Sequence, residues 1–245
     1  MGFWNTVQKI QDKTRPLCSM IVAAAGSSTR MGGQDKMFAR LGGAPVLMRT
    51  ICAIDQAELV SEIVVAASEE NMEEVAALCA RSGLRKKVKV VKGGASRTES
   101  VLAAALECDP KAELIAIHDG ARPLVRPDMI DEMIRLGGTT HAVAPAIPMK
   151  DTVKIEDANG LVLSTPDRST LYAVQTPQVF QANILKAALQ AALASGEPVT
   201  DDCAAVERLG KRVWLAEGDA ENIKITTPVD LIIVEALLRQ REDGR

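Results

Sequence analysis

One stretch of the chain decides its fold: CSMIVAAAGSSTRMGGQDK, residues 18–36. The segment from Met20 to Ala25 is apolar without alternation, which is typical of a short strand buried on both faces in a parallel sheet. The segment that follows is small, polar and glycine-containing, so a ligand can approach the backbone and N–H groups can face phosphate oxygens. Arg30 and Lys36 add two cations that can offset the charge of a phosphate chain. The stretch therefore predicts a buried strand that leads into a phosphate-binding loop.

This loop differs from the two common nucleotide-binding loops. It lacks the Gly-Lys-Ser/Thr ending of the Walker pattern, and Ser28 and Arg30 interrupt the glycine spacing of the dinucleotide pattern. One alternative is a tight connection without a ligand, since glycine-rich turns after a first strand are common in α/β proteins. The remaining pattern, A-A-A-G-S-S-T-R-M-G-x-x-x-K, resembles the loop of nucleotidyltransferases that couple a nucleoside triphosphate to a sugar or polyol phosphate.

The composition argues against several classes of protein. The 245 residues are 47% hydrophobic but only 2% aromatic, which predicts an aliphatic core without stacking platforms for single-stranded nucleic acid. A net charge of -3 gives no global basic field for DNA or RNA. Five scattered cysteines without a C-x-x-C pair favour reduced thiols in a cytoplasmic protein. No apolar run reaches the roughly 18 residues of a membrane helix, so we expect no membrane partner.

The order of the expected elements predicts an α/β domain. Further buried strands are expected at residues 63–67, 88–91, 114–117 and 142–146. Helical patterns lie between them, which indicates a Rossmann-like, mainly parallel twisted sheet with helices on both faces. We expect a single domain over residues 18–240, preceded by an N-terminal extension over residues 1–17.

The rhythm changes between residues 147 and 175. The segment from Asp151 to Glu156 alternates like a half-exposed strand, and Asn159-Gly160 is a strong hairpin signal before the return at residues 161–163. Because no helix separates these strands, we expect a β-arm that projects from the body. An arm too small for its own core generally needs a partner surface, which suggests a homodimer formed by exchanging arms.

A glycine pair in the middle of the chain is a second candidate ligand site. Gly93-Gly94 leads into a helix start, the geometry that offers backbone donors to a ligand. Ser96 and Glu99 also fit a capping box, so this segment can equally serve only to begin the helix, with Arg97 as a surface charge.

The motif H-D-G-A-R-P follows the strand expected at residues 114–117. Asp119 therefore lies just past the carboxyl end of a buried strand, where open α/β sheets bind ligands. Its carboxylate can cap the turn, or it can bind Mg²⁺, which typically takes one or two carboxylates plus phosphate oxygens. We expect His118 to orient the turn rather than to react.

Several motifs together carry a resemblance to a known family: A-A-A-G-S-S-T-R-M-G, G-G-A-S-R-T-E-S-V, H-D-G-A-R-P, K-D-T-V-K, D-R, Q-T-P-Q-V-F, T-D-D and N-I-K-I-T-T-P-x-D. In this order they resemble the 2-C-methyl-D-erythritol 4-phosphate cytidylyltransferases of the non-mevalonate isoprenoid route, over about Cys18 to Leu238. The resemblance implies a CTP-dependent enzyme with a Mg²⁺ cofactor. It would transfer a cytidylyl group from CTP to 2-C-methyl-D-erythritol 4-phosphate and release pyrophosphate.

The resemblance also implies roles for individual residues. The cytidine would be held by Ala24, Ala25, Gly26, Gly94 and Ser100. The acceptor would be bound by Asp119, Arg122, Thr152, Arg168 and Lys224, of which Thr152 and Arg168 lie in the arm. Asp119 would also help to hold Mg²⁺. The catalytic residues would be Arg30 and Lys36, on the α-phosphate, with Arg168 and Lys224, on the acceptor phosphate.

Two other functions stay open. An enzyme with the same chemistry could use another acceptor, such as ribitol 5-phosphate. A catalytically silent nucleotide-binding protein could also have this fold, because fold alone does not determine function. The joint presence of five charged residues argues against it: Arg30, Lys36, Asp119, Arg168 and Lys224.

Overall fold

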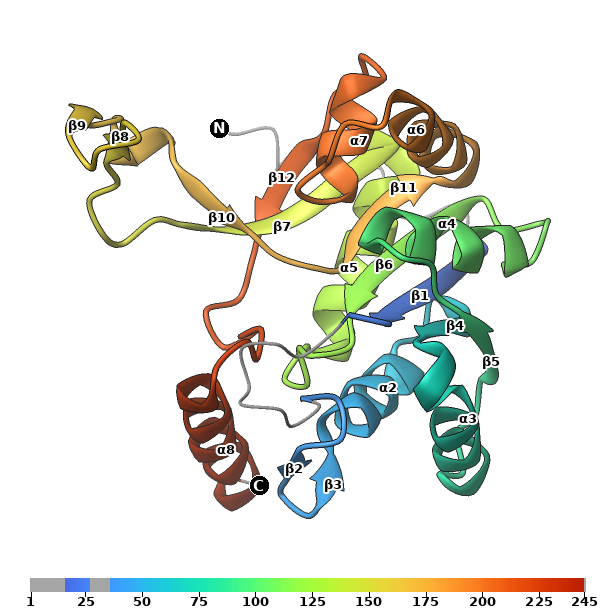
Figure 1. The fold of residues 1–245 in the computed structure, drawn as a ribbon. Helices are drawn as coiled ribbons and strands as arrows, with labels where there is room; N and C mark the ends of the chain where they lie inside the picture. Colours follow the sequence, from blue (N-terminus) through green and yellow to red (C-terminus); the bar gives the residue numbers. More distant parts are fainter. Residues whose placement is uncertain (1–15, 27–35, 245) are drawn as a thin grey trace.

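The computed structural model describes residues 16–26 and 36–244, so most of the expected N-terminal extension and Arg30 lie outside the described residues. Within these ranges, eight strands form one sheet in the order β10-β7-β11-β6-β1-β4-β5, with β12 also paired to β7 (Figure 1). The strands are β1 (Cys18–Ala24), β4 (Val60–Ala67), β5 (Lys87–Lys92), β6 (Leu114–Asp119), β7 (Ala142–Pro148), β10 (Tyr172–Val174), β11 (Gln178–Gln181) and β12 (Trp214–Glu217).

The predicted fold class is confirmed, with one addition. Strands β6, β1, β4 and β5 run parallel, as the alternation of strands and helices predicts. Strand β11, by contrast, lies antiparallel between β6 and β7. The strands expected from the sequence do not include β11, because four residues between a proline and a helix carry little strand signal.

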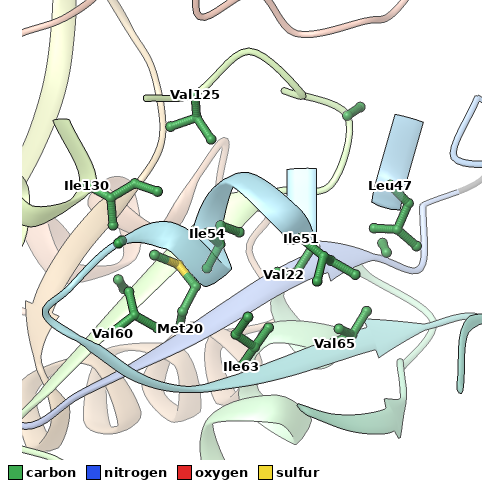
Figure 2. Packing of buried hydrophobic residues seen from close by; sticks show 14 of the residues in the cluster. Met20, Val22, Leu47, Ile51, Ile54, Val60, Ile63, Val65, Val125 and Ile130 are labelled. Atoms are coloured by element: carbon green, nitrogen blue, oxygen red, sulfur yellow. The ribbon is translucent and has the colours of Figure 1, made fainter. Parts of the chain in front are cut away.

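Helices cover both faces of the sheet, because successive side chains of a buried strand point to opposite faces. On β1, Met20 and Val22 face one core cluster and Ile21 faces the other. Figure 2 shows the first cluster, in which α2 packs over β1 and β4. The helices are α2 (Val46–Gln56), α3 (Met72–Arg81), α4 (Arg97–Glu107), α5 (Pro127–Thr140), α6 (Ala182–Ser195), α7 (Asp202–Arg208) and α8 (Pro228–Asp243).

The segment between β7 and β11 projects from the body as an arm (Figure 1). Its tip is the predicted hairpin, in which β8 (Ile155–Glu156) pairs antiparallel with β9 (Val162–Ser164). The Asp157 carboxylate closes the turn by accepting the N–H groups of Asn159 and Leu161, both at 2.9 Å. The paired strands are shorter than the alternating pattern suggests. The assignment of residues 18–240 to a single domain stays a prediction.

The remaining short elements are β2 (Arg40–Leu41), β3 (Ala44–Pro45) and the 3-10 turns η3 (Glu69–Asn71) and η4 (Arg168–Thr170). Strands β2 and β3 pair antiparallel just before α2, and η4 lies in the arm. None of the helices in residues 16–26 and 36–244 combines the length and apolar character needed to cross a membrane.

The core predicts a clear difference between two aliphatic truncations. Ile63 of β4 is 0% exposed, so Ile63→Ala should lower the free energy of unfolding by about 2–5 kcal/mol through lost burial and a residual cavity. Leu106 of α4 is 59% exposed, and Leu106→Ala should change the free energy of unfolding by about 0.5 kcal/mol or less. Urea denaturation measures both; equal losses would contradict this assignment of the core.

Candidate functional site

The ends of β1 and β5 form a compact backbone surface with the start of α4. The N–H of Gly93 donates to the carbonyl oxygen of Ala67 at 2.8 Å. A Cβ on Gly93 would lie 2.5 Å from the Ala25 Cβ and 2.9 Å from the Ser100 Oγ, so the close approach requires glycine here. The N–H of Gly94 donates to the Ser100 hydroxyl at 3.1 Å. Three of the predicted nucleotide-binding residues, Ala25, Gly94 and Ser100, therefore gather in one place.

The other predicted nucleotide-binding residues flank this surface. Ala24 is buried at the end of β1, and Gly26 is exposed just beyond it. Ser96 begins α4 by accepting the N–H of Glu99 at 3.1 Å, so its predicted capping role is confirmed. Capping and ligand binding are compatible here, because a capped helix start still presents backbone donors on its open side.

Lys36 follows the glycine-rich loop in the sequence and is the first described residue after residues 27–35. It is half-buried, and the next residue, Met37, is 4% exposed. A Cβ on Gly120 would lie 3.2 Å from the Met37 sulfur, so the segment that carries Lys36 packs against the loop after β6. The hydroxyl of Thr50 on α2 donates to the Gly120 carbonyl at 2.8 Å and holds this loop from the other side.

Asp119 ends β6 as a buried carboxylate surrounded by cations. Its Oδ2 lies 3.0 Å from the Lys224 Nζ and 3.3 Å from the Arg122 Nε. Its Oδ1 lies 3.8 Å from a guanidinium nitrogen of Arg97. Burial raises the pKa of Asp119, but Lys224, Arg97 and Arg122 together outweigh it and hold the pKa well below its usual value. The carboxylate therefore stays ionised at neutral pH.

Arg97 and Asp202 are the functional candidates that the sequence did not single out. Arg97 is two-thirds buried, and its Nη1 lies 2.7 Å from the Oδ2 of Asp202, whose side chain is 1% exposed. The surface-charge interpretation of Arg97 is therefore wrong. Asp201, the first Asp of the T-D-D motif, caps α7 by accepting the N–H of Ala204 at 2.9 Å. Asp202, the second Asp of that motif, was the sequence feature that could have indicated a partner for Arg97.

A hydrogen-bonded frame fixes the segment that carries Lys224. The guanidinium of Arg122 donates to the Asn222 carbonyl at 2.6 Å, and the Asn222 amide donates to the Thr176 carbonyl at 2.8 Å. The N–H of Ile225 donates to the Ala121 carbonyl at 2.9 Å. Lys224 thus lies between two residues that are bonded to the motifs H-D-G-A-R-P and Q-T-P.

His118 belongs to this frame, as predicted. Burial lowers its pKa to about 4, so the imidazole is neutral. Its Nε2 lies 3.3 Å from the Arg122 carbonyl oxygen, which can only accept a proton, and its Nδ1 lies 3.0 Å from the Thr176 hydroxyl. We infer that Nε2 carries the proton and Nδ1 accepts from Thr176. The Thr176 hydroxyl in turn accepts the N–H of Asp119 at 3.1 Å.

The two predicted arm residues lie apart from the Asp119 cluster. Thr152 is exposed, and Arg168 is exposed in η4 with its Nη1 bonded to the Lys150 carbonyl at 2.8 Å. Their predicted role in acceptor binding stays a prediction, because an exchanged arm would carry them to a neighbouring subunit rather than to the site of their own chain.

The donor set suits Mg²⁺ only in combination with a phosphate substrate. Within the described residues, no group of three or more His, Cys, Asp or Glu side chains is placed to hold a metal ion. Asp119 offers one carboxylate, and its Oδ1 is separated from Arg97 by 3.8 Å. Mg²⁺ ordinarily keeps several waters and binds one or two carboxylates plus phosphate oxygens, so a single carboxylate fits this pattern.

Comparisons with known proteins agree on one family. The family model for 2-C-methyl-D-erythritol 4-phosphate cytidylyltransferase matches residues 18–240. A relative with this name from Caldanaerobacter subterraneus subsp. tengcongensis is 43% identical over 228 residues, which cover 91% of this chain and 99% of that protein. One from Symbiobacterium thermophilum is 42% identical, over 91% of this chain and 93% of that protein. The crystal structure of 4-diphosphocytidyl-2C-methyl-D-erythritol synthase from Anaerococcus prevotii matches with a TM-score of 0.82 and 30% identity, covering 92% of this chain and 100% of that one.

The buried imidazole predicts a specific loss of stability in acid. The unfolded chain takes up a proton at His118 below about pH 6.5, whereas the folded protein does so only near pH 4. Stability is therefore complete above pH 6.5 and falls as the pH drops from 6.5 to 4. Between pH 7.5 and 5 this group should remove about 2 kcal/mol from the free energy of unfolding.

Urea denaturation at the two pH values measures this effect. His118→Gln should lose less stability than the parent protein between pH 7.5 and 5, by about that 2 kcal/mol. His141→Asn, at the exposed histidine, is the matched control and should follow the parent curve. An unchanged pH dependence in His118→Gln would rule out a buried neutral imidazole.

Proposed function

Because the chain belongs to the 2-C-methyl-D-erythritol 4-phosphate cytidylyltransferase family, we propose that its two substrates meet at the cluster around Asp119. The protein is a CTP-dependent nucleotidyltransferase that makes 4-diphosphocytidyl-2-C-methyl-D-erythritol in isoprenoid biosynthesis. The observation that carries the proposal is the convergence of Lys224, Arg122 and Arg97 on one buried carboxylate beside the glycine-rich surface.

The reaction explains why cations dominate such a site. A phosphate monoester of the acceptor attacks the α-phosphorus of CTP, and pyrophosphate leaves. Two anions must approach, so positioned positive charge stabilises the transition state more than an acid–base pair would. The monoester is largely doubly ionised at neutral pH, since its second pKa is about 6, and no dedicated base is needed.

We assign the two halves of the site to different segments. The backbone around Ala24, Ala25 and Gly26 would hold the cytidine together with Gly94 and Ser100, which are already joined by a hydrogen bond just before α4 and packed against Ala25. Lys36 and Arg30 would neutralise the α-phosphate. Lys224 and Arg122, fixed by the Asn222 frame, would orient the acceptor phosphate.

Asp119 would hold Mg²⁺ through Oδ1, the oxygen that Lys224 and Arg122 leave uncovered. When bound, the ion would offset charge on the triphosphate and on the leaving pyrophosphate. Asp119 also holds Lys224 in place, so its carboxylate would serve both substrates.

The arm would complete the site of a second subunit. Its apolar side chains are unusually exposed: Ile155 (49%), Leu161 (67%), Val162 (51%), Leu163 (63%) and Tyr172 (47%). A patch of this kind on a segment without a core of its own marks an interaction surface. A homodimer would cover these side chains and bring Thr152 and Arg168 to the acceptor phosphate of the neighbouring subunit.

We also propose a cytoplasmic location. All five cysteines are free in the structure, and four of them are buried. Unpaired, buried thiols are typical of proteins that stay in a reducing compartment.

Ribitol 5-phosphate remains the alternative acceptor, since its phosphate would meet the same cations.

Removing the Lys224 charge should abolish efficient transfer without unfolding the protein. Lys224→Ala should lower kcat/KM by roughly 10²–10³-fold, by analogy with other preorganised electrostatic donors. The measurement is pyrophosphate release with CTP, Mg²⁺ and either 2-C-methyl-D-erythritol 4-phosphate or ribitol 5-phosphate. Lys89→Ala, at a lysine paired with Glu107, is the control and should keep full turnover. Unchanged turnover in Lys224→Ala would remove Lys224 from the mechanism, and release with ribitol 5-phosphate alone would overturn the acceptor.

The dimer proposal makes a separate prediction. The parent protein should sediment as a dimer, and Leu163→Asp should sediment as a monomer, because a carboxylate in an apolar interface is costly. Leu106→Asp, equally exposed on α4, should leave the dimer intact. A parent protein that sediments as a monomer at micromolar concentration would contradict exchange of the arms.

A further inference from the structure

Arg97 occupies an asymmetric position between two carboxylates. One guanidinium nitrogen lies 2.7 Å from Asp202, a close ion pair, and another lies 3.8 Å from Asp119, beyond hydrogen-bond distance. The Asp202 side chain is 1% exposed, whereas that of Arg97 is 33% exposed. Since water cannot replace Arg97 at a carboxylate this deeply buried, the guanidinium is held on Asp202 and turns its second nitrogen toward Asp119.

The position of Asp202 is itself fixed from the sheet. Gln178 of β11 donates its amide N–H to Asp201 at 2.8 Å and accepts the N–H of Cys203 at 3.2 Å, so both neighbours of Asp202 are bonded to one side chain. Gln178 pairs in register with Ile117 of β6, two residues before Asp119. Because β11 and β6 are neighbouring strands, they fix the start of α7 relative to the end of β6. This sets the separation between Asp202 and Asp119, which Arg97 spans.

We propose that Arg97 is a positioning residue for Asp119 in the transfer reaction, and that Asp202 is the buried anchor that limits its reach. At 3.8 Å the guanidinium attracts and orients Oδ1 but leaves this oxygen uncovered. Freed from Asp202, Arg97 could close on Asp119 as a bidentate pair at about 2.7–2.9 Å and compete with any ligand for that oxygen. The inference rests on the role proposed above for Asp119.

A purely structural role makes different predictions. The ion pair also joins the first residue of α4 to the first residue of α7, so it could serve only to hold these helices together. In that case its loss would lower stability and leave turnover of the folded enzyme intact. Arg97→Lys separates the two roles, because an ammonium can keep the charge beside Asp202 but is a compact point charge that cannot fork toward a second carboxylate.

The experiment compares Arg97→Lys, Asp202→Asn, Asp119→Asn and the double variant Arg97→Lys/Asp119→Asn. It measures kcat and KM for both substrates and the melting temperature. In Arg97→Lys we expect kcat to fall roughly tenfold to a hundredfold, with little change in melting temperature, since a misplacement of about 1 Å can cost this much. Asp202→Asn should lower kcat similarly where it folds. In the double variant the Arg97 change should lower kcat by less than about a further twofold relative to Asp119→Asn, because Arg97 acts through Asp119.

The matched control is Asp55→Asn. Asp55 is also a buried carboxylate with an arginine partner, Arg85 at 3.3 Å, but it lies at the end of α2, before β4 begins. This variant should lower the melting temperature and leave kcat unchanged. Full turnover in Arg97→Lys would overturn the positioning role but leave the proposed site intact. The same holds if the losses in kcat from the Arg97 and Asp119 changes multiply in the double variant. Unchanged turnover in Asp119→Asn would overturn the site proposed for the reaction, and the positioning role with it.

Discussion

The ion pair between Asp119 and Lys224 is the interaction on which the site depends. It joins the end of a central strand to a loop near the carboxyl end of the chain, across 3.0 Å. A lone carboxylate buried to this extent would be strongly destabilised, and a buried pair is stabilising only where further hydrogen bonds satisfy both groups. Arg122 supplies a further bond to the buried carboxylate, and it also donates to the Asn222 carbonyl of the loop that carries Lys224. The Lys224 side chain is partly exposed and keeps contact with water.

The surrounding charges are balanced so that the site stays attractive to anions. Lys224, Arg122 and Arg97 all lie within 3.8 Å of the Asp119 carboxylate, and only Arg97 is shared with Asp202, so the cations around Asp119 outnumber its single charge. This excess is held by groups that cannot relax away from it, because the loops around it are bonded to one another through Thr176, Asn222 and His118. Preorganised charge of this kind needs little reorganisation when a phosphate arrives.

The features of this arrangement that depend on a local sequence pattern could be predicted from the sequence. The apolar run of β1 and the position of Asp119 after a buried strand follow from strand periodicity and from where parallel sheets bind ligands. Asn159-Gly160 gave the hairpin of the arm. Lys224 was placed only through its resemblance to a family, since nothing local distinguishes a lysine near a strand end.

The missed features depend on tertiary contacts. β11 is too short to show a period, and its strand character comes from its neighbours β6 and β7. Asp202 follows Asp201 at a helix start, where either residue could cap. The two residues differ in that Asp202 is buried and paired with Arg97, and this burial arises only in the folded chain.

The separation of the site residues along the chain has a consequence for synthesis in the cell. The contact between Arg122 and Asn222 spans 100 residues, and α8 follows it. Domains emerge from the ribosome amino end first, and contacts between distant residues form late. The glycine-rich surface can therefore form on a nascent chain well before Lys224 emerges. With the acceptor role proposed for Lys224 and Arg122, nucleotide transfer would have to wait until almost the whole chain has been translated.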